Sequence, residues 1–264
     1  MGHYESPEGA YWAFFERFNA KDAQGWAAVM SYPHVRVSAG VPTGERGRSF
    51  HPRTSARLYP TADDYGSTAE ATGWERFEVT GWVRTQGIEP RRIHESDDKV
   101  HLAGGWTRYR ADDSAIVSNR VLYVLTRLES GWGIQARFGV DSYNEGSDRS
   151  EQEEAALAAL GRTMTTLEAG DVDAWLDCFH YPLTLVGAPG SVDTMNDAEE
   201  MRAAFGDWAG AALPIQYTAD VIAAGETGVT LAQSITRGGD SFEQAFLIAE
   251  RESGWKILAV TAIA

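Results

Sequence analysis

The stretch Trp26-Ala-Ala-Val-Met-Ser-Tyr-Pro-His-Val-Arg-Val-Ser38 decides how the chain is organised. It has the pattern of a helix end, a stop at Tyr32-Pro33 and the start of a strand at His34, because proline cannot continue a helix and favours extended geometry before it. The same pattern returns 149 residues later, as Trp175-Leu-Asp-Cys-Phe-His-Tyr-Pro-Leu-Thr-Leu-Val-Gly187. The chain is therefore predicted to be a duplication, in which each copy serves as a control for the other.

The residues around these stretches predict helices followed by strands in both copies. In the first copy, helices over 9–30 and 62–73 flank a strand at 34–38 and a Gly- and Pro-rich loop at 40–60, and strands follow at about 74–95, 99–110, 115–129 and 132–140. In the second copy, helices are predicted over 151–168, 171–179 and 197–209, with strands over 183–187, 215–224, 228–237, 241–252 and 255–263. The polar stretch 145–150 is interpreted as a linker between a first domain, 1–144, and a second domain, 151–264.

Composition places the chain among ordinary globular proteins. It has 264 residues, of which 43% are hydrophobic and 23% charged, and it contains no run of eighteen apolar residues that would predict a membrane span. The polar, acidic start of the chain lacks the pattern of a secretory signal. A single cysteine, Cys178, excludes an internal disulfide and favours a reducing compartment, so a cytoplasmic location is expected.

Charge is distributed unevenly between the copies. The net charge of −15 argues against a nucleic-acid partner, whose phosphates require basic patches. Residues 1–150 hold 18 basic against 20 acidic side chains, whereas residues 151–264 hold 5 against 18. Fifteen of the 20 arginines precede Asn144. The first copy alone is thus equipped to meet an anion or a carbonyl oxygen.

The order of elements resembles the nuclear transport factor two-like superfamily, which includes ketosteroid isomerase and the SnoaL-like polyketide cyclases. The resemblance depends on Asp22-(x3)-Trp26 and Asp171-(x3)-Trp175, on the two Tyr-Pro strand starts and on the Gly-Trp pairs that open the last strands. It implies an α+β fold of two cone-shaped domains. Each would pack three N-terminal helices on a curved antiparallel sheet, a cystatin-like roll, and the two would form an intrachain pseudo-dimer.

The functional residues of the ketosteroid isomerases are missing at the matching positions. Their helix-one tyrosine corresponds to Phe14 and Thr163, and their aspartate base corresponds to Ser38 and Gly187. The resemblance therefore predicts the fold and leaves the chemistry open, because one cone-shaped fold serves many functions.

Differences between the copies indicate where a site lies. His34, Arg36 and Ser38 alternate along one strand, and the second copy has Leu183, Leu185 and Gly187 there. In the last strand Gln135 and Arg137 become Leu258 and Val260, and in the strand before it Asn119 and Tyr123 become Phe242 and Phe246. These faces enclose either a polar cavity in the first copy and a filled core in the second, or a solvent-exposed surface in the first that a partner surface covers in the second.

Each candidate residue has a chemical role in the cavity interpretation. His34 is the candidate general acid or base, since imidazole titrates near neutral pH, with a purely structural histidine as the alternative. Arg36, Arg137 and Tyr123 would stabilise a carboxylate, a phosphate or a developing enolate oxygen. The remaining candidates would bind or enclose the substrate, and they are Ser38, Asn119, Gln135, Trp74, Trp106, Arg53 and Arg57.

Two functions fit this pattern. The first is a cofactor-independent acid/base enzyme, of isomerase, cyclase, dehydratase or hydrolase type, that acts on a small oxygen-rich or anionic molecule in the first domain. The second is a non-catalytic small-molecule-binding or accessory protein. Neither His-x-His nor His-Glu-x-x-His spacing occurs, so no metal is expected, and no cofactor motif is present. The second domain is expected to be structural and to replace a second subunit, so that the protein is a monomer without a membrane partner.

Overall fold

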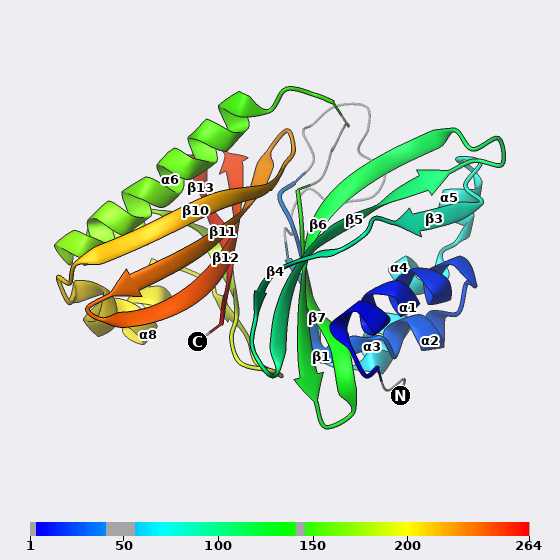
Figure 1. Ribbon diagram of the computed structural model, residues 1–264, viewed down its shortest axis with the longest axis horizontal. Coiled ribbons are helices and arrows are strands. Elements are labelled where there is room, and N and C mark those ends of the chain that lie inside the picture. The colour runs from blue at the N-terminus through cyan, green and yellow to red at the C-terminus, as the bar shows by residue number, and fades with distance from the viewer. Residues whose placement is uncertain (1–3, 41–55, 141–145, 264) are drawn as a thin grey trace.

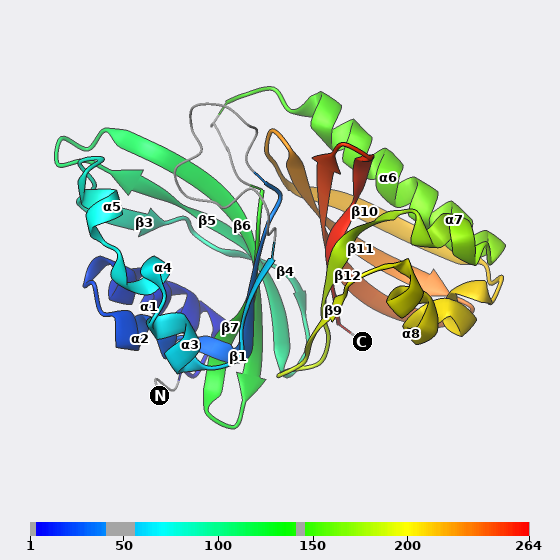
Figure 2. The same ribbon diagram turned by 180° about the vertical axis from the view of Figure 1, so that it is seen from behind.

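The chain forms two domains of the same plan that lie side by side (Figure 1). The computed structural model describes residues 4–40, 56–140 and 146–263. Each domain is a curved sheet with helices on one face, and the two sheets turn their other faces towards each other at the centre (Figures 1 and 2). This arrangement is the intrachain pseudo-dimer of α+β domains that the sequence predicts.

The N-terminal domain begins with capped helices. In α1 (Pro7–Asn19) the Ser6 side chain accepts a hydrogen bond from the Gly9 amide, and α2 (Ala23–Ala27) is capped in the same way by Asp22. Three short helices follow the strand β2 (Ala56–Tyr59), namely α3 (Ala62–Gly66), α4 (Ala69–Thr72) and α5 (Glu75–Glu78). The predicted capping box at Thr61 and Asp64 opens α3.

The N-terminal sheet has the strand order β2-β1-β7-β6-β5-β3, with β4 also paired to β5. Its strands are β1 (Met30–Ser38), β2 (Ala56–Tyr59), β3 (Arg84–Gly87), β4 (Arg91–Glu95), β5 (Lys99–Tyr109), β6 (Ala115–Leu128) and β7 (Gly131–Gly139). The sequence predicted an antiparallel sheet. The sheet is mixed instead, because the first strand, β1, runs parallel to the last strand, β7.

The C-terminal domain repeats this order in shorter form. Its helices are α6 (Ser150–Ala169), α7 (Val172–Leu176) and α8 (Ala198–Gly210). Its strands are β8 (Phe179–Val186), β9 (Val192–Met195), β10 (Ile215–Ala224), β11 (Gly228–Arg237), β12 (Asp240–Arg251) and β13 (Gly254–Ile263), in the order β10-β11-β12-β13-β8-β9. Asp171 caps α7 as Asp22 caps α2, which gives the repeated Asp-(x3)-Trp motif a structural role.

Several predicted segments differ from the structure, among them the following. The strand expected at 74–95 is wrong at its start, because Phe77 lies in α5 and packs with Phe18 and Trp82; only β3 and β4 are extended. The described end of the predicted loop, 56–59, forms strand β2 against β1. Strand β1 begins before the Tyr-Pro step, and Pro33 falls where the β1–β7 register is irregular, so its missing N–H costs no ladder bond.

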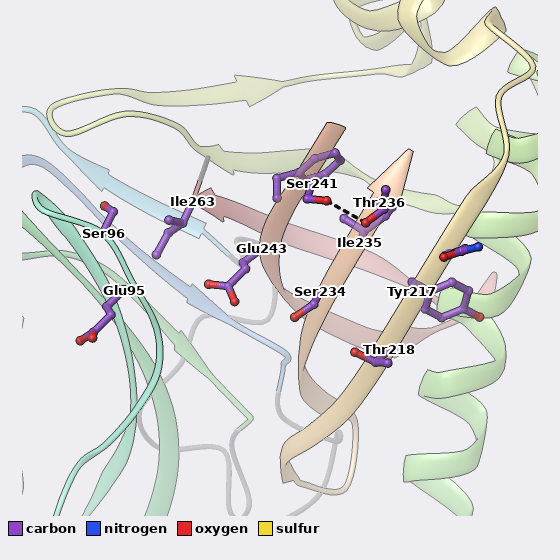
Figure 3. Close-up of a pocket in the computed structure, with 12 residues that line it drawn as sticks. Glu95, Ser96, Tyr217, Thr218, Ser234, Ile235, Thr236, Ser241, Glu243 and Ile263 are labelled. Carbon is purple, nitrogen blue, oxygen red and sulfur yellow. Dashed lines mark hydrogen bonds between the residues drawn. The ribbon is translucent and has the colours of Figure 1, made fainter. Parts of the chain in front are cut away.

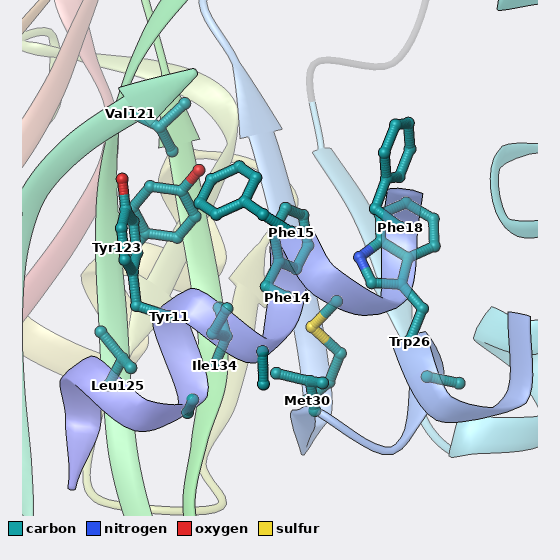
Figure 4. Close-up of a cluster of buried hydrophobic side chains, with 14 of the residues drawn as sticks. Tyr11, Phe14, Phe15, Phe18, Trp26, Met30, Val121, Tyr123, Leu125 and Ile134 are labelled. Atoms are coloured by element: carbon teal, nitrogen blue, oxygen red, sulfur yellow. The ribbon is translucent and has the colours of Figure 1, made fainter. Parts of the chain in front are cut away.

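Aromatic side chains fill the space between α1 and the N-terminal sheet (Figure 4). Tyr11, Phe14, Phe15 and Phe18 project from α1 and are at most 4% exposed. Their rings meet edge to face, as in the pairs Tyr11–Tyr123 and Phe18–Trp26, which have centroids 5.0 Å apart. Aromatic pairs of this kind stabilise a core beyond the burial of their area, by about 0.5–1.5 kcal/mol each.

The two sheets pack through small and aliphatic side chains together with the aromatic ring of Phe138. The shared cluster includes Val35, Val37 and Phe138 from the N-terminal domain and Leu247, Ala249 and Leu258 from the C-terminal domain, all at most 1% exposed. Packing is close at Gly228, where a Cβ atom would lie 2.1 Å from the Cβ atom of Ala39. This apolar contact resembles the interface of a permanent dimer.

A buried polar group also joins the domains. The Lys99 Nζ atom donates to the carbonyl oxygens of Val186, Gly187 and Ala262 at 2.9, 2.6 and 2.8 Å. Burial lowers the pKa of Lys99 to about 7, and the three carbonyls oppose that shift because only the charged ammonium offers three N–H groups. Next to it, His101 Nε2 lies 3.1 Å from Thr261 Oγ1 of the other domain.

Candidate functional site

A row of polar side chains crosses the face of the N-terminal sheet that the helices cover. Arg57 on β2 is the register partner of Arg36 on β1, Arg36 is the partner of Arg137 on β7, and Arg137 is the partner of Tyr123 on β6. Register partners on neighbouring strands project from the same face of a sheet. Three guanidinium groups and a phenol therefore stand in line across four strands.

The row borders a cavity of about 20 Å³. Six of the predicted site residues line it together, and they are Arg36, Ser38, Trp106, Asn119, Tyr123 and Arg137. A volume of this size holds about one water molecule, so the cavity accommodates an end group of a ligand rather than a whole organic molecule. Arg36 lines the cavity, is half-buried and adjoins Arg57 on β2. The site therefore extends from the cavity along the row towards Arg57.

Arg137 is held in place at the centre of the row. Its side chain belongs to a residue only 8% exposed, and its guanidinium lies over the ring of Phe14, with 5.1 Å between Cζ and the ring centroid. The Nη2 atom donates to Tyr65 Oη at 3.2 Å, and the Nε atom donates to His34 Nε2 at 3.4 Å. A fixed, charged guanidinium is suited to binding a planar carboxylate or a phosphate.

Both ring nitrogens of His34 contact the protein. Nδ1 lies 2.8 Å from the carbonyl oxygen of Ile134, which only accepts, so Nδ1 carries the proton. Nε2 is then the acceptor for Arg137 Nε, and the ring is a neutral imidazole. With no exposed surface and both nitrogens used, His34 is arranged to orient Arg137; this geometry favours the structural alternative for His34 over the acid/base role.

Tyr123 lies at the other end of the row, 1% exposed and against the edges of Tyr11 and Phe14. Burial raises the pKa of Tyr123 well above its usual value, so its hydroxyl stays protonated at neutral pH. A buried, protonated phenol beside Arg137 is a hydrogen-bond donor for an anionic oxygen.

Gln135 lies outside the cavity, although the sequence places it inside. The β6–β7 register shifts between Val124 and Leu125, opposite Ala136 and Ile134, so that Gln135 is the extra residue of a bulge. Its Nε2 atom donates to the Ser191 carbonyl of the C-terminal domain at 3.2 Å. Leu258, its counterpart in the second domain, lies in the hydrophobic cluster between the two sheets. Both residues of this pair therefore belong to the interface between the domains.

The other predicted binding residues have separate positions. Trp74 does not line the cavity but packs among core aromatics, with ring centroids 5.0 Å from Phe18 and 6.0 Å from Trp26. Arg57 adjoins Arg36 on the neighbouring strand. Arg53 lies outside the described residues.

Sequence reasoning missed two features. Tyr65 on α3 is fully buried and contacts Arg137, yet a single tyrosine on a short helix carries no local signal of this role. Gln233 and Gln244 are register partners on β11 and β12, in place of Gly104 and Val121 of the first domain. Gln233 is 1% exposed, and among the described residues neither of its amide atoms has a hydrogen-bond partner, so the second domain is not filled by apolar groups alone.

Two features of the described residues bear on other classes of function. Within residues 4–40, 56–140 and 146–263, no group of three or more His, Cys, Asp or Glu side chains is arranged to hold a metal ion. In the same part of the chain, no helix has the length and apolar character needed to cross a bilayer.

Comparisons with solved structures find proteins that are similar to part of this chain. A protein of unknown function from Pectobacterium atrosepticum is 22% identical, with a TM-score of 0.35, and covers 41% of this chain and 87% of its own. A nuclear transport factor two-like protein of unknown function from Silicibacter pomeroyi is 19% identical, with a TM-score of 0.37, and covers 44% and 98%. A cystatin-like domain of unknown function from Nostoc punctiforme is 12% identical, with a TM-score of 0.38, and covers 59% and 92%.

No family model matches the chain, and no curated protein matches it. These structures, described as nuclear transport factor two-like or cystatin-like or as of unknown function, each cover between 41% and 59% of this chain. The function has to be argued from the site itself.

Proposed function

We propose that the N-terminal domain binds a small, oxygen-rich organic anion through a carboxylate or phosphate group. The observation that carries this proposal is the row of Arg57, Arg36 and Arg137 in register, next to the protonated hydroxyl of Tyr123. An anion bound beside these guanidinium groups would accept charge-assisted hydrogen bonds from them. The second domain has Leu185 and Val260 as the register partners that replace Arg36 and Arg137.

The small cavity defines how the anion would lie. Its volume of about 20 Å³ accommodates one oxygen-bearing end group against Arg137, Tyr123 and Asn119. Arg36 and Arg57 then face the remainder of the ligand along the row. A bidentate contact from Arg137 would supply most of the affinity, because charge-assisted hydrogen bonds are stronger in a buried site than in water.

Acid/base catalysis at the same site is the second candidate. It is favoured by the length of the Arg137 Nε to His34 Nε2 contact, 3.4 Å, which is long for a hydrogen bond. A substrate oxygen that drew the Arg137 guanidinium away would release Nε2 as a general base, and catalytic contacts often tighten only when substrate is bound. The neutral ring, with Nδ1 on the Ile134 carbonyl, is already in the required tautomer.

The test replaces first-domain residues by those of the second domain. Arg36→Leu and Arg137→Val are compared with the wild type in calorimetric titrations against inorganic phosphate, succinate and benzoate. We expect the wild type to bind at least one of these anions and Arg137→Val to weaken that binding by about 100-fold, the loss of two charge-assisted hydrogen bonds. Arg127→Leu, an exposed arginine of the same sheet, is the matched control and should bind like the wild type.

Unchanged binding in Arg36→Leu and Arg137→Val, or equal losses in the Arg127→Leu control, would contradict the proposal. His34→Gln separates the two candidates, because its amide retains hydrogen-bonding capacity but does not titrate near neutral pH. Binding kept with loss of turnover in this variant would support catalysis; a parallel decline in binding alone would support the positioning role.

A further inference from the structure

Two buried histidines meet at the contact between the domains. His94 on β4 and His101 on β5 are register partners, with ring centroids 5.3 Å apart and Nδ1 atoms 3.1 Å apart. His101 has no exposed surface, and His94 is 7% exposed. On its other side, His101 Nε2 lies 3.1 Å from Thr261 Oγ1 of the C-terminal domain. This histidine pair and Thr261 therefore form one chain of hydrogen bonds that crosses from one domain to the other.

The short distance between the two Nδ1 atoms limits how many protons the histidine pair can hold. A hydrogen bond between two ring nitrogens needs one N–H group and one lone pair, so one Nδ1 atom carries a proton and the other does not. One added proton leaves this bond intact when it is placed on the outer nitrogen of the donor ring. A second added proton puts N–H groups on both Nδ1 atoms, which then face each other with like charge. The closed contact therefore excludes the doubly charged pair.

Charged groups of both domains act on the histidine pair. Lys99 shares the His101 face of β5, and its ammonium is held by three carbonyl oxygens of the C-terminal domain. Burial lowers the pKa of His101 well below its usual value, and the positive charges of Lys99 and His94 lower it further. Burial also lowers the pKa of His94, and the Glu243 carboxylate on β12 opposes that shift. Charged side chains also occur further along the two facing sheet surfaces, and they are Arg91, Arg120 and Asp220.

A groove beside the histidine pair gives solvent access to it. Glu95 and Ser96, at the end of β4, and Glu243 and Ile263 of the C-terminal domain line this groove of about 590 Å³ between the domains (Figure 3). His94 immediately precedes Glu95, and Thr261 lies two residues before Ile263 on β13. The chain of hydrogen bonds therefore borders the groove, and protons can reach it without the unfolding of either domain.

We propose that the histidine pair is a pH-sensitive element of the interdomain contact, which is closed while the pair is neutral and loosens as the pair takes up protons in mildly acidic solution. Full protonation converts the contact between the Nδ1 atoms from a hydrogen bond into a repulsion, and it adds charge beside Lys99. In the loosened state both rings are hydrated and titrate at the usual histidine pKa of about 6.5. The pair therefore stabilises the closed contact fully above about pH 6.5, and this effect is lost progressively as the pH falls towards the lower pKa values of the closed state.

The test measures how readily the contact opens. Thr184 on β8 is 1% exposed and is the register partner of Ala259, which belongs to the hydrophobic cluster between the sheets. In a Cys178→Ser background, Thr184→Cys places a thiol there that a pyridyl disulfide reaches only when the domains separate. Its reaction rate is divided by the rate for Thr165→Cys, exposed on α6, which corrects for the effect of pH on the thiolate.

We expect this relative rate to rise by about tenfold or more between about pH 7.5 and about pH 5.5. His94→Asn supplies an amide that does not titrate at the position of Nδ1, so the rise should then stay below about twofold. His180→Ser is the matched control, because His180 is also buried but its hydrogen-bonding partners belong to its own domain. The rise in this variant should equal that of the parent protein.

A relative rate that does not change with pH, or an equal rise in His94→Asn, would overturn the proposal. A measurement on the unaltered protein is independent of whether the variants fold. At neutral pH, NMR spectra of the ring nitrogens should show a single Nδ1–H in the histidine pair and a coupling between the two Nδ1 atoms across their hydrogen bond. The absence of this coupling would equally contradict the proposal.

Discussion

The two domains share a backbone register and differ in what they bury. Arg36 pairs with Arg137 in the first sheet, and Leu185 pairs with Val260 at the same positions of the second. The bulge in the pairing of the last two strands also recurs, opposite Val124 and Leu125 in the first domain and opposite Leu247 and Ile248 in the second. At equivalent register positions the first sheet therefore carries charged side chains where the second carries apolar ones.

The largest effect is expected at the interface between the domains, where Lys99 has no basic counterpart in the second domain. The corresponding position of β11 is Gly228. Lys99→Met removes the donor shared by three carbonyl oxygens of the other domain, and we expect it to lower the free energy of unfolding by about 2–4 kcal/mol, measured by urea denaturation.

The control for that prediction is Lys21→Met. Lys21 forms an exposed ion pair with Glu78, and pairs of this kind contribute at most about 1 kcal/mol. Equal stability losses in the two variants would show that the three carbonyl contacts of Lys99 contribute nothing particular to the pairing of the domains.

Gln233 allows a test of how a buried polar group affects the stability of the second domain. Replacing Gln233 by Met keeps the volume and removes two amide atoms that lack partners among the described residues. We expect a gain of about 1–2 kcal/mol in the free energy of unfolding, since an unsatisfied buried polar group is costly. Thermal and urea denaturation measure it, and a loss of stability would indicate that the amide is satisfied in solution.

The smallest predicted effect is a pH dependence at His180, where the first domain has Ser31. Both side chains reach the equivalent carbonyl: His180 Nε2 lies 2.9 Å from Ala249 O, and Ser31 Oγ lies 3.2 Å from Thr126 O. Burial lowers the pKa of His180 to about 4, so the unfolded chain takes up the proton first as the pH falls. This residue therefore favours folding above its unfolded pKa of about 6.5, and that contribution is lost progressively towards pH 4.

His180→Ser should flatten the acid limb of the stability profile between about pH 6.5 and pH 4 and keep the carbonyl contact. Denaturation series at several pH values measure the slope. A slope that is identical in the variant and the wild type would show that another group controls the acid limb.

Much of the scaffold could be predicted from the repeated phrase, because Trp26, Tyr32 and Pro33 recur at a fixed offset and predict the helix end and strand together. The same offset of 149 residues aligned Arg36 with Leu185, and an offset of 123 residues between the final strands aligned Arg137 with Val260. Gln135 was misplaced for the same reason: the bulge is present in both copies, so it leaves the alignment intact while it reverses the direction of one side chain.

Other features depend on contacts distant in sequence. The contact between His34 and Arg137 joins residues 103 apart, and Tyr65 reaches Arg137 from a helix of five residues. The short helix at Glu75–Glu78 replaces an expected strand because Trp74, Phe77 and Trp82 pack with one another; aromatic residues favour strands when only local preference is considered.

The position shared by Lys99 and Gly228 has a consequence for how this interface can change. In a homodimer each substitution appears on both sides of the twofold axis, so a lysine would enter both halves of the contact or neither. Here both halves belong to one chain, and association is intramolecular, with an effective concentration set by the short connection between the domains. One side can therefore carry a long cation while the other admits the close approach of Ala39, and each can mutate without a matching change in its counterpart.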